Sequence, residues 1–266
     1  MRIRRKVSKP HRAERPLFIV GFSAASPALP DLASWFDLEY GGPIRLRELV
    51  GQEAETDIRS PLAEATHGPW TAIIRLSLSV SEAEEWKNRL GWLHPLAASV
   101  STTSLPPAEA CNAILHASRL ARGITLLTDG TSYDLAAQSF FNPSDWRDQA
   151  LDLFRTGDHV KVVQAETPDA KQDWFSTRGL GKFGLDEIET FRPIGLPHQP
   201  ILDTLVAIAD EIVRTGRSPK VGSTVHIEQF GVIVQVVRHR TVPSAGIPLI
   251  LREITWQSFE PEGKDL

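Results

Sequence analysis

The sequence predicts an α+β protein, and two patterns carry that prediction. In the first part of the chain, short apolar strands alternate with helices in the order β-α-β-α-β, which implies a mixed sheet with helices on one face. In the last part, one strongly amphipathic helix precedes three stretches typical of an antiparallel meander. The 266 residues suffice to bury a sizeable core in one large domain or two small lobes.

The N-terminal layer begins with a short apolar run. Residues 17–23 are almost continuously apolar and predict a buried strand. Pro30 then favours a helix over residues 31–39, because proline is well tolerated in the first helical turn, and Gly41 ends it. Residues 51–69 are mostly polar and contain two prolines, which predicts a long loop.

The clearest strand is predicted at residues 70–80, where alternate residues are apolar and serines lie on the other face. Ser81 and Glu84 have the spacing of a capping box, in which each side chain bonds the other residue's backbone N–H. A helix is therefore expected over residues 82–93. The next expected strand is residues 96–102.

A second long helix is expected to begin at Pro106 and Pro107 and to run to Arg122. Gly123 has the position of its C-terminal cap. Residues 124–128 then predict a third strand, followed by an Asp-Gly turn.

The C-terminal part is led by a helix at residues 201–215, whose apolar side chains recur at helical spacing. Gly231 marks a tight turn or bulge between two strands. The elements expected here are helices at 145–156 and 201–215 and strands at 159–165, 225–230, 232–238 and 249–256.

The predicted elements divide the chain into three parts. Residues 1–16 form a basic, disordered arm. Residues 17–156 form an α/β-type lobe, and residues 157–260 form an α+β lobe that is either separate or continuous with the first.

Composition excludes several classes of protein. The net charge of −4 gives no overall basic field for nucleic acid, so that role is expected only through residues 1–16, which carry seven Lys and Arg. Cys111 is the single cysteine, which excludes an intramolecular disulfide framework and indicates a reducing cytoplasm. No apolar run approaches the ~20 residues of a membrane span. Residues 1–25 also have the order of a cleaved secretory signal, but their prolines and short apolar core favour an arm before a strand.

The most distinctive stretch is residues 177–189, which contains the pattern G-x-G-x-x-G of nucleotide-binding loops. A dinucleotide site needs a long helix after the glycines, with its N-terminus at the pyrophosphate. Here Pro193 limits any helix to residues 185–191, and no apolar parallel strand follows. We therefore expect a tight structural corner that depends on the conformational freedom of its glycines. The alternative is an anion-binding nest.

In the alternative, two cations flank the turn and hold a phosphate or carboxylate, while the turn amides hydrogen-bond to it. One of the two acidic residues after the turn would then serve as a base. The candidate ligand-binding residues are Trp174, Arg178, Gly179, Gly181, Lys182, Asp186 and Glu187.

Other candidate sites are better explained by structure. Asp129 and Asp134 have the setting of a turn with side-chain hydrogen bonds rather than of paired catalytic carboxylates. Cys111 and His116 lie five residues apart on a helix and so face different directions. The pattern His226, Glu228 and His239 is typical of an exposed sheet face. We predict no catalytic residue, no metal and no cofactor.

Two blocks carry a resemblance to a known family. Residues 118–146 include Thr-Asp-Gly-Thr-Ser-Tyr-Asp and end at Pro143 and Trp146. Residues 174–189 read Trp-Phe-Ser-Thr-Arg-Gly-Leu-Gly-Lys-Phe-Gly-Leu-Asp-Glu-Ile-Glu. Together they resemble an uncharacterised bacterial α+β family, a domain of unknown function whose members include proteins near toxin–immunity or secretion loci. The family supplies no catalytic residues.

The resemblance and the acidic body together predict a non-catalytic protein-binding factor of a bacterium, either immunity-like or secretion-associated, located in the cytoplasm. Its expected partner is another protein rather than a small molecule. The alternative is an anion-binding or enzymatic domain that uses the glycine turn 179–184 with Arg178 and Lys182.

Overall fold

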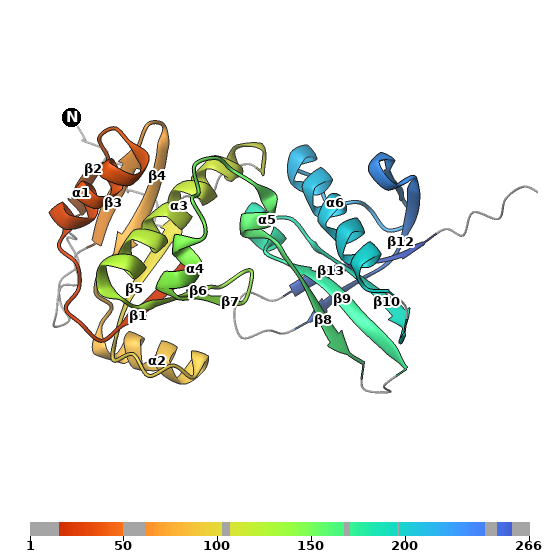
Figure 1. Cartoon of the computed structure of the whole chain (residues 1–266), viewed down its shortest axis with the longest axis horizontal. Helices are drawn as coiled ribbons and strands as arrows, with labels where there is room; N and C mark the ends of the chain where they lie inside the picture. Colours follow the sequence, from red (N-terminus) through yellow and green to blue (C-terminus); the bar gives the residue numbers. More distant parts are fainter. Residues whose placement is uncertain are drawn as a thin grey trace, which may run out of the picture.

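The computed structural model has an α+β architecture built on two sheets (Figure 1). A seven-stranded sheet comes from the N-terminal part of the chain and a six-stranded sheet from the C-terminal part, so the predicted class is confirmed. The arm predicted at residues 1–16 lies outside the described residues, apart from Pro16. The structure describes residues 16–49, 62–102, 107–167, 171–195, 197–242 and 249–256.

The seven-stranded sheet has the order β2-β3-β4-β5-β1-β6-β7, and all its neighbouring pairs are antiparallel. Its side chains alternate between two buried faces: Phe18 and Val20 join the larger core cluster, whereas Ile19 joins the smaller one. The strands are β1 (Pro16–Phe22), β2 (Arg45–Leu49), β3 (Leu62–His67), β4 (Trp70–Arg75), β5 (Leu96–Thr102), β6 (Thr131–Asp134) and β7 (Ser139–Phe141).

Helices cover both faces of this sheet, so the prediction of helices on one face is wrong. Helices α1 (Leu29–Tyr40) and α3 (Pro107–Thr128) contribute to the larger core cluster, and α3 contacts β1, β4 and β5. Helix α2 (Val80–Leu90) packs on the opposite face, where its Ala83 lies in the smaller cluster with Ile19.

The six-stranded sheet has the order β11-β12-β13-β10-β9-β8. Among the described strands, β10 and β13 form a parallel pair in this sheet. The mixed sheet was predicted for the N-terminal part instead, and there the prediction is wrong, because all pairs of the seven-stranded sheet are antiparallel. Helix α6 (Gln199–Thr215) packs on this sheet, and the predicted helix and antiparallel meander are confirmed by α6 and strands β11 to β13. The strands are β8 (Lys161–Glu166), β9 (Gln172–Arg178), β10 (Glu187–Pro193), β11 (Thr224–Ile227), β12 (Val232–Val242) and β13 (Leu249–Trp256).

Helix α3 joins the two sheets. It contacts both α6 and the short 3-10 helix η1 (Leu180–Phe183) of the C-terminal part. The larger core cluster is continuous from Val20 in β1 to Ile188 in β10. Three short elements complete the fold: α4 (Pro143–Arg147), α5 (Thr156–His159) and the 3-10 helix η2 (Glu228–Phe230).

Helix α3 is longer than the sequence predicts. The strand expected at residues 124–128 is wrong, because these residues form the last turns of the helix. Gly123 lies inside the helix rather than at its cap. A Cβ added there would meet the Trp35 ring at 2.6 Å and Leu32 Cδ1 at 2.9 Å. The glycine therefore allows α1 to pack closely on α3.

The strand expected at residues 70–80 ends at Arg75, and the following helix begins at Val80, two residues earlier than predicted. The capping box is formed by Ser79 and Glu82 rather than by Ser81 and Glu84. The Ser79 backbone N–H donates to Glu82 Oε2 at 3.0 Å, and the Glu82 backbone N–H donates to Ser79 Oγ at 3.3 Å.

The helix expected at residues 145–156 is wrong. Two short helices, α4 and α5, replace it, and Leu151 between them adopts a left-handed φ of 54°, which a continuous helix does not allow. Strands β2, β3, β6 and β7 were not predicted. β3 lies within the range expected as a loop, and its exposed partner strand β2 carries charges at Arg45 and Arg47 that obscure the alternation.

Candidate functional site

The glycine segment forms the corner between β9 and β10. Gly179 precedes η1, and Gly184 ends it with a left-handed φ of 70°. Strand β10 begins at Glu187, so the short helix considered at residues 185–191 is wrong. A dinucleotide site needs a long helix at this place, and the observed strand removes the support for that function.

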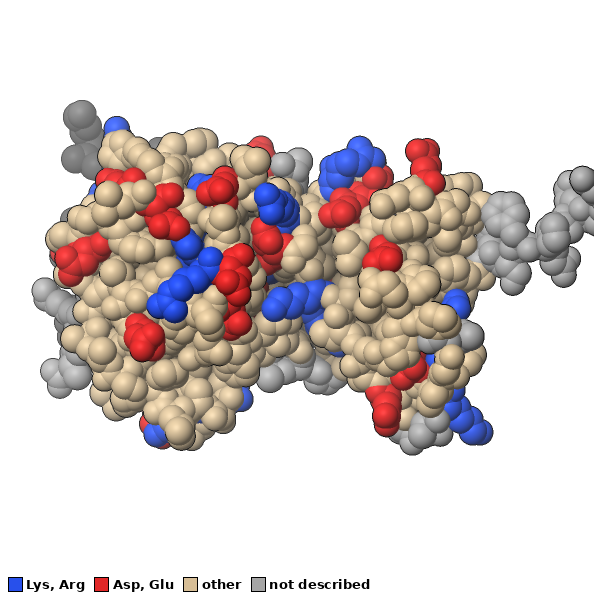
Figure 2. All heavy atoms as spheres, viewed as in Figure 1, with Lys and Arg blue, Asp and Glu red and all other residues tan. Residues whose placement is uncertain are grey.

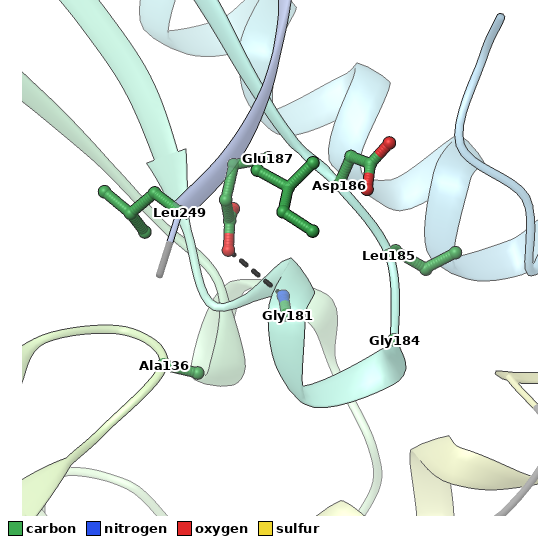
Figure 3. A pocket seen from close by; sticks show the side chains of 8 residues that line it. Ala136, Gly181, Gly184, Leu185, Asp186, Glu187 and Leu249 are labelled. Atoms are coloured by element: carbon green, nitrogen blue, oxygen red, sulfur yellow. Dashed lines mark hydrogen bonds between the residues drawn. The ribbon is translucent and has the colours of Figure 1, made fainter. Parts of the chain in front are cut away.

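The corner already contains an anion, the carboxylate of Glu187. Its Oε1 accepts hydrogen bonds from the backbone N–H groups of Gly179 at 2.9 Å and Gly181 at 3.1 Å. Its Oε2 accepts from Thr177 Oγ1 at 2.8 Å. Figure 3 shows the carboxylate pointing to the Gly181 amide while Asp186 points away. Burial raises the pKa of Glu187, and the hydrogen bonds from the turn oppose that rise.

Gly179 is required by a close backbone approach. Its φ is 121°, and a Cβ at this position would lie 2.2 Å from the carbonyl oxygen of His159. Glycine alone among the residues accepts both constraints. Gly181 differs, because the nearest atom to an added Cβ is Glu187 Oε1 at 3.8 Å.

The Lys182 side chain lies across the junction of the two sheets. Its Nζ is 2.5 Å from Oδ2 of Asp134 at the end of β6, and the two side chains are 0% and 3% exposed. Nζ also lies 5.6 Å from the centre of the Phe18 ring. A buried ion pair of this kind leaves no free ammonium for a ligand.

His159 extends this polar junction. Its Nδ1 lies 3.4 Å from Ser118 Oγ on α3, and its ring stacks on Phe154 at 4.9 Å. Its buried Nε2 has no hydrogen-bond partner in the described part of the chain. Burial, followed by the charge of Lys182, lowers the pKa of His159 well below its ordinary value, so the ring is neutral.

Arg178 and Trp174 belong to a second cluster on β9. Two guanidinium groups lie close to the Trp174 ring, that of Arg178 at 5.2 Å and that of Arg240 at 5.5 Å from its centre. Glu189 connects them, since it accepts from Trp174 Nε1 at 2.8 Å and from Arg240 Nε at 2.7 Å. Arg178 is 5% exposed and donates to the Thr177 carbonyl at 2.8 Å.

Asp186 is committed to a different set of partners. Its Oδ2 accepts from Arg252 Nε at 2.6 Å, and its backbone N–H donates to Ser218 Oγ at 2.7 Å. Asp186 therefore fixes β13 and the segment that follows α6 to the corner rather than serving as a free base.

A small cavity lies beside the turn, between the two sheets (Figure 3). Its volume is about 150 Å³, and its walls include Ala136, Leu185, Leu249 and Ile250. Small-molecule sites usually have ~300–1,000 Å³ and convergent polar groups, so this cavity is a packing gap at the corner.

The structure thus brings the predicted candidates together only in part. One group consists of Glu187 and the amides of Gly179 and Gly181. A second group consists of Trp174 and Arg178. The side chains of Lys182 and Asp186 instead contact residues far away in the sequence. The partners that sequence reasoning missed come from distant elements, and no spacing in the sequence identifies them. They are Asp134, Ser218, Arg240 and Arg252.

The other motifs have structural roles. Asp134 Oδ1 accepts from the backbone N–H groups of Ala136 and Ala137, at 3.0 and 2.9 Å, in addition to its contact with Lys182. His116 is buried, and its Nε2 lies 3.0 Å from the Ala65 carbonyl. Burial lowers the pKa of His116 to about 4. In the parts of the chain that the structure describes, no group of His, Cys, Asp and Glu side chains has the arrangement of a metal site.

No family model, curated protein or solved structure matches this chain. The described helices include none that is both long and apolar enough to cross a membrane.

Proposed function

We propose that this chain is a non-catalytic protein-binding factor of the bacterial cytoplasm, immunity-like or secretion-associated. The support for the kind of factor is the resemblance of residues 118–146 and 174–189 to a bacterial family found near such loci. The observation that carries the proposal is that Lys182, Asp186 and Glu187 of the glycine corner have partners inside the protein. Arg178 is buried and donates to the Thr177 carbonyl. The corner then has a structural role in connecting the two sheets, and the binding site for a partner lies on the outer surface.

The outer strand β8 is the surface best suited to hold a protein. It is the longest of the four outer strands, with 6 residues, and pairs with β9 on one side. Residues 162–165 within it carry no charge, whereas β2 is protected by charged side chains. A strand from a partner would add to β8 through backbone hydrogen bonds.

The charge distribution favours long-range attraction of a partner over binding at a single charged patch. The face in Figure 2 shows acidic and basic side chains interspersed, with no large area of one sign. Because the residues after the basic arm are acidic overall, a basic partner would approach faster at low salt than at physiological salt.

The test is capture of a partner by the full chain, followed by reconstitution of the complex from the two purified proteins. The exposed Ala165 in β8 and the exposed Thr224 in β11 offer matched sites, because Ala165→Lys and Thr224→Lys add the same charge to different outer strands. We expect Ala165→Lys to weaken the complex at least about tenfold and Thr224→Lys to leave it unchanged. Absence of any stoichiometric complex at both low and physiological salt would rule out the function, and equal loss in both variants would rule out β8.

A further inference from the structure

The six-stranded sheet has a gap between β10 and β13. These parallel strands pair over three residues each, and the last pair is Glu189 opposite Glu253. Strand β10 continues to Pro193 and β13 continues to Trp256. Among the described residues, no backbone pairing joins these two continuations, so the strands separate toward their C-terminal ends.

A cavity occupies this gap. At its inner end, Thr190 Oγ1 donates to the carbonyl of Ile254 at 3.0 Å, which fixes the point at which the strands part. The cavity has a volume of about 580 Å³ and is lined mainly by the separating ends of β10 and β13. This volume falls within the ~300–1,000 Å³ of small-molecule sites, unlike that of the cavity beside the glycine turn.

The cavity has an excess of positive charge. Arg192 stacks on the Trp256 ring at 4.9 Å, and its buried Nε has no hydrogen-bond partner among the described residues. Arg238 forms an ion pair with Glu253, 2.7 Å from Oε2, and its side chain is 57% exposed. The cavity wall thus contains two guanidinium groups and one carboxylate, and that carboxylate is paired with Arg238. Arg192 lies opposite Asp173 in the register of β9 and β10, but its Nε still has a hydrogen bond to donate to a ligand in the cavity.

We propose that this gap binds a small organic oxyanion, a carboxylate or a phosphate ester. Arg192 and Arg238 would bind the oxyanion, because a guanidinium group donates two parallel hydrogen bonds to either group. The Trp256 ring, already covered by Arg192 on one face, would contact the apolar part of the ligand. The glycine turn differs, because Glu187 already occupies its amides.

The test is calorimetric titration of the full chain with inorganic phosphate, AMP and benzoate. The three probes distinguish binding of a free phosphate, a phosphate ester and a carboxylate. At about 0.15 M salt, where the screening length is about 8 Å, a contact-range pair still contributes to binding. We expect at least one probe to bind with a Kd of about 1 mM or lower. Arg192→Gln and Arg238→Gln should each weaken that binding by about tenfold or more.

The matched control is Arg45→Gln, which removes the same charge from an exposed site on β2 of the other sheet. It should leave the Kd unchanged. Urea unfolding of each variant, compared with the wild type, separates lost binding from lost folding. Absence of binding by all three probes up to about 10 mM would overturn the proposal. Equal binding by the Arg192, Arg238 and Arg45 variants would also overturn it. Either outcome leaves the protein-binding function of β8 untouched.

Discussion

At the scale of single residues, the corner depends on one glycine and one glutamate. The glycine pattern predicts a tight turn from the sequence, because only glycine accepts such backbone angles. The role of Glu187 could not be predicted in the same way. Its spacing from the turn is equally compatible with a base facing solvent and with a carboxylate folded back onto the amides of Gly179 and Gly181.

The first prediction separates two neighbouring glycines. Gly179→Ala should lower the free energy of unfolding by about 3 kcal/mol or more, because the added Cβ meets the His159 carbonyl and the left-handed φ is strained. Gly181→Ala, which has no close backbone neighbour, should cost less than about 1 kcal/mol. Urea unfolding measures both. Equal losses of stability in the two variants would show that Gly179 is under no greater steric constraint than Gly181.

At the scale of elements, strong local patterns predicted structure well and tertiary contacts explain the failures. The helix at residues 201–215 was predicted because its apolar stripe is set by its own sequence, and α6 confirms it. The end of α3 was predicted wrongly because Gly123 accommodates Trp35 from another helix, which no local pattern reports. Strand β3 was missed for a different reason, since its two fully buried side chains, Ala63 and Ala65, give only a weak apolar signal within a polar stretch.

The second prediction concerns the joint between β6 and η1. Lys182→Met should lower the free energy of unfolding by about 3–5 kcal/mol, because it leaves the Asp134 carboxylate buried without its cation. Adding Asp134→Asn removes that charge and keeps an acceptor for the Ala136 and Ala137 amides, so the double variant should recover part of the loss. A double variant less stable than Lys182→Met alone would contradict this account of the joint.

At the scale of the whole molecule, two buried histidines make stability depend on pH. Burial lowers the pKa of His116 to about 4 and that of His159 in the same direction. Their ordinary value is about 6.5, so below that pH the unfolded chain binds protons that the folded chain excludes. The stability that these groups provide is complete above pH ~6.5 and is lost as the pH falls toward 4. The raised pKa of Glu187 acts in the opposite direction above its ordinary value of 4.5.

The third prediction follows from this linkage. Between pH 7 and pH 5, His116 alone should account for about 2 kcal/mol of lost unfolding free energy. His116→Gln keeps a donor for the Ala65 carbonyl and should remove that part of the pH dependence. The control is His226→Gln, at an exposed position on β11, which should leave the dependence as it is in the wild type. Identical pH profiles for both variants would contradict the assignment to His116.

The central claim is that the glycine turn has a structural role at the junction of the two sheets. The Glu187 carboxylate accepts hydrogen bonds from the amides that a nucleotide phosphate would need. Amide hydrogen exchange at Gly179 and Gly181 in the ligand-free protein tests it most directly. The account predicts that both amides exchange slowly, close to the rate of global unfolding, and that phosphate or a nucleotide changes neither rate. Fast exchange in the free protein that becomes slow when either anion is added would contradict it.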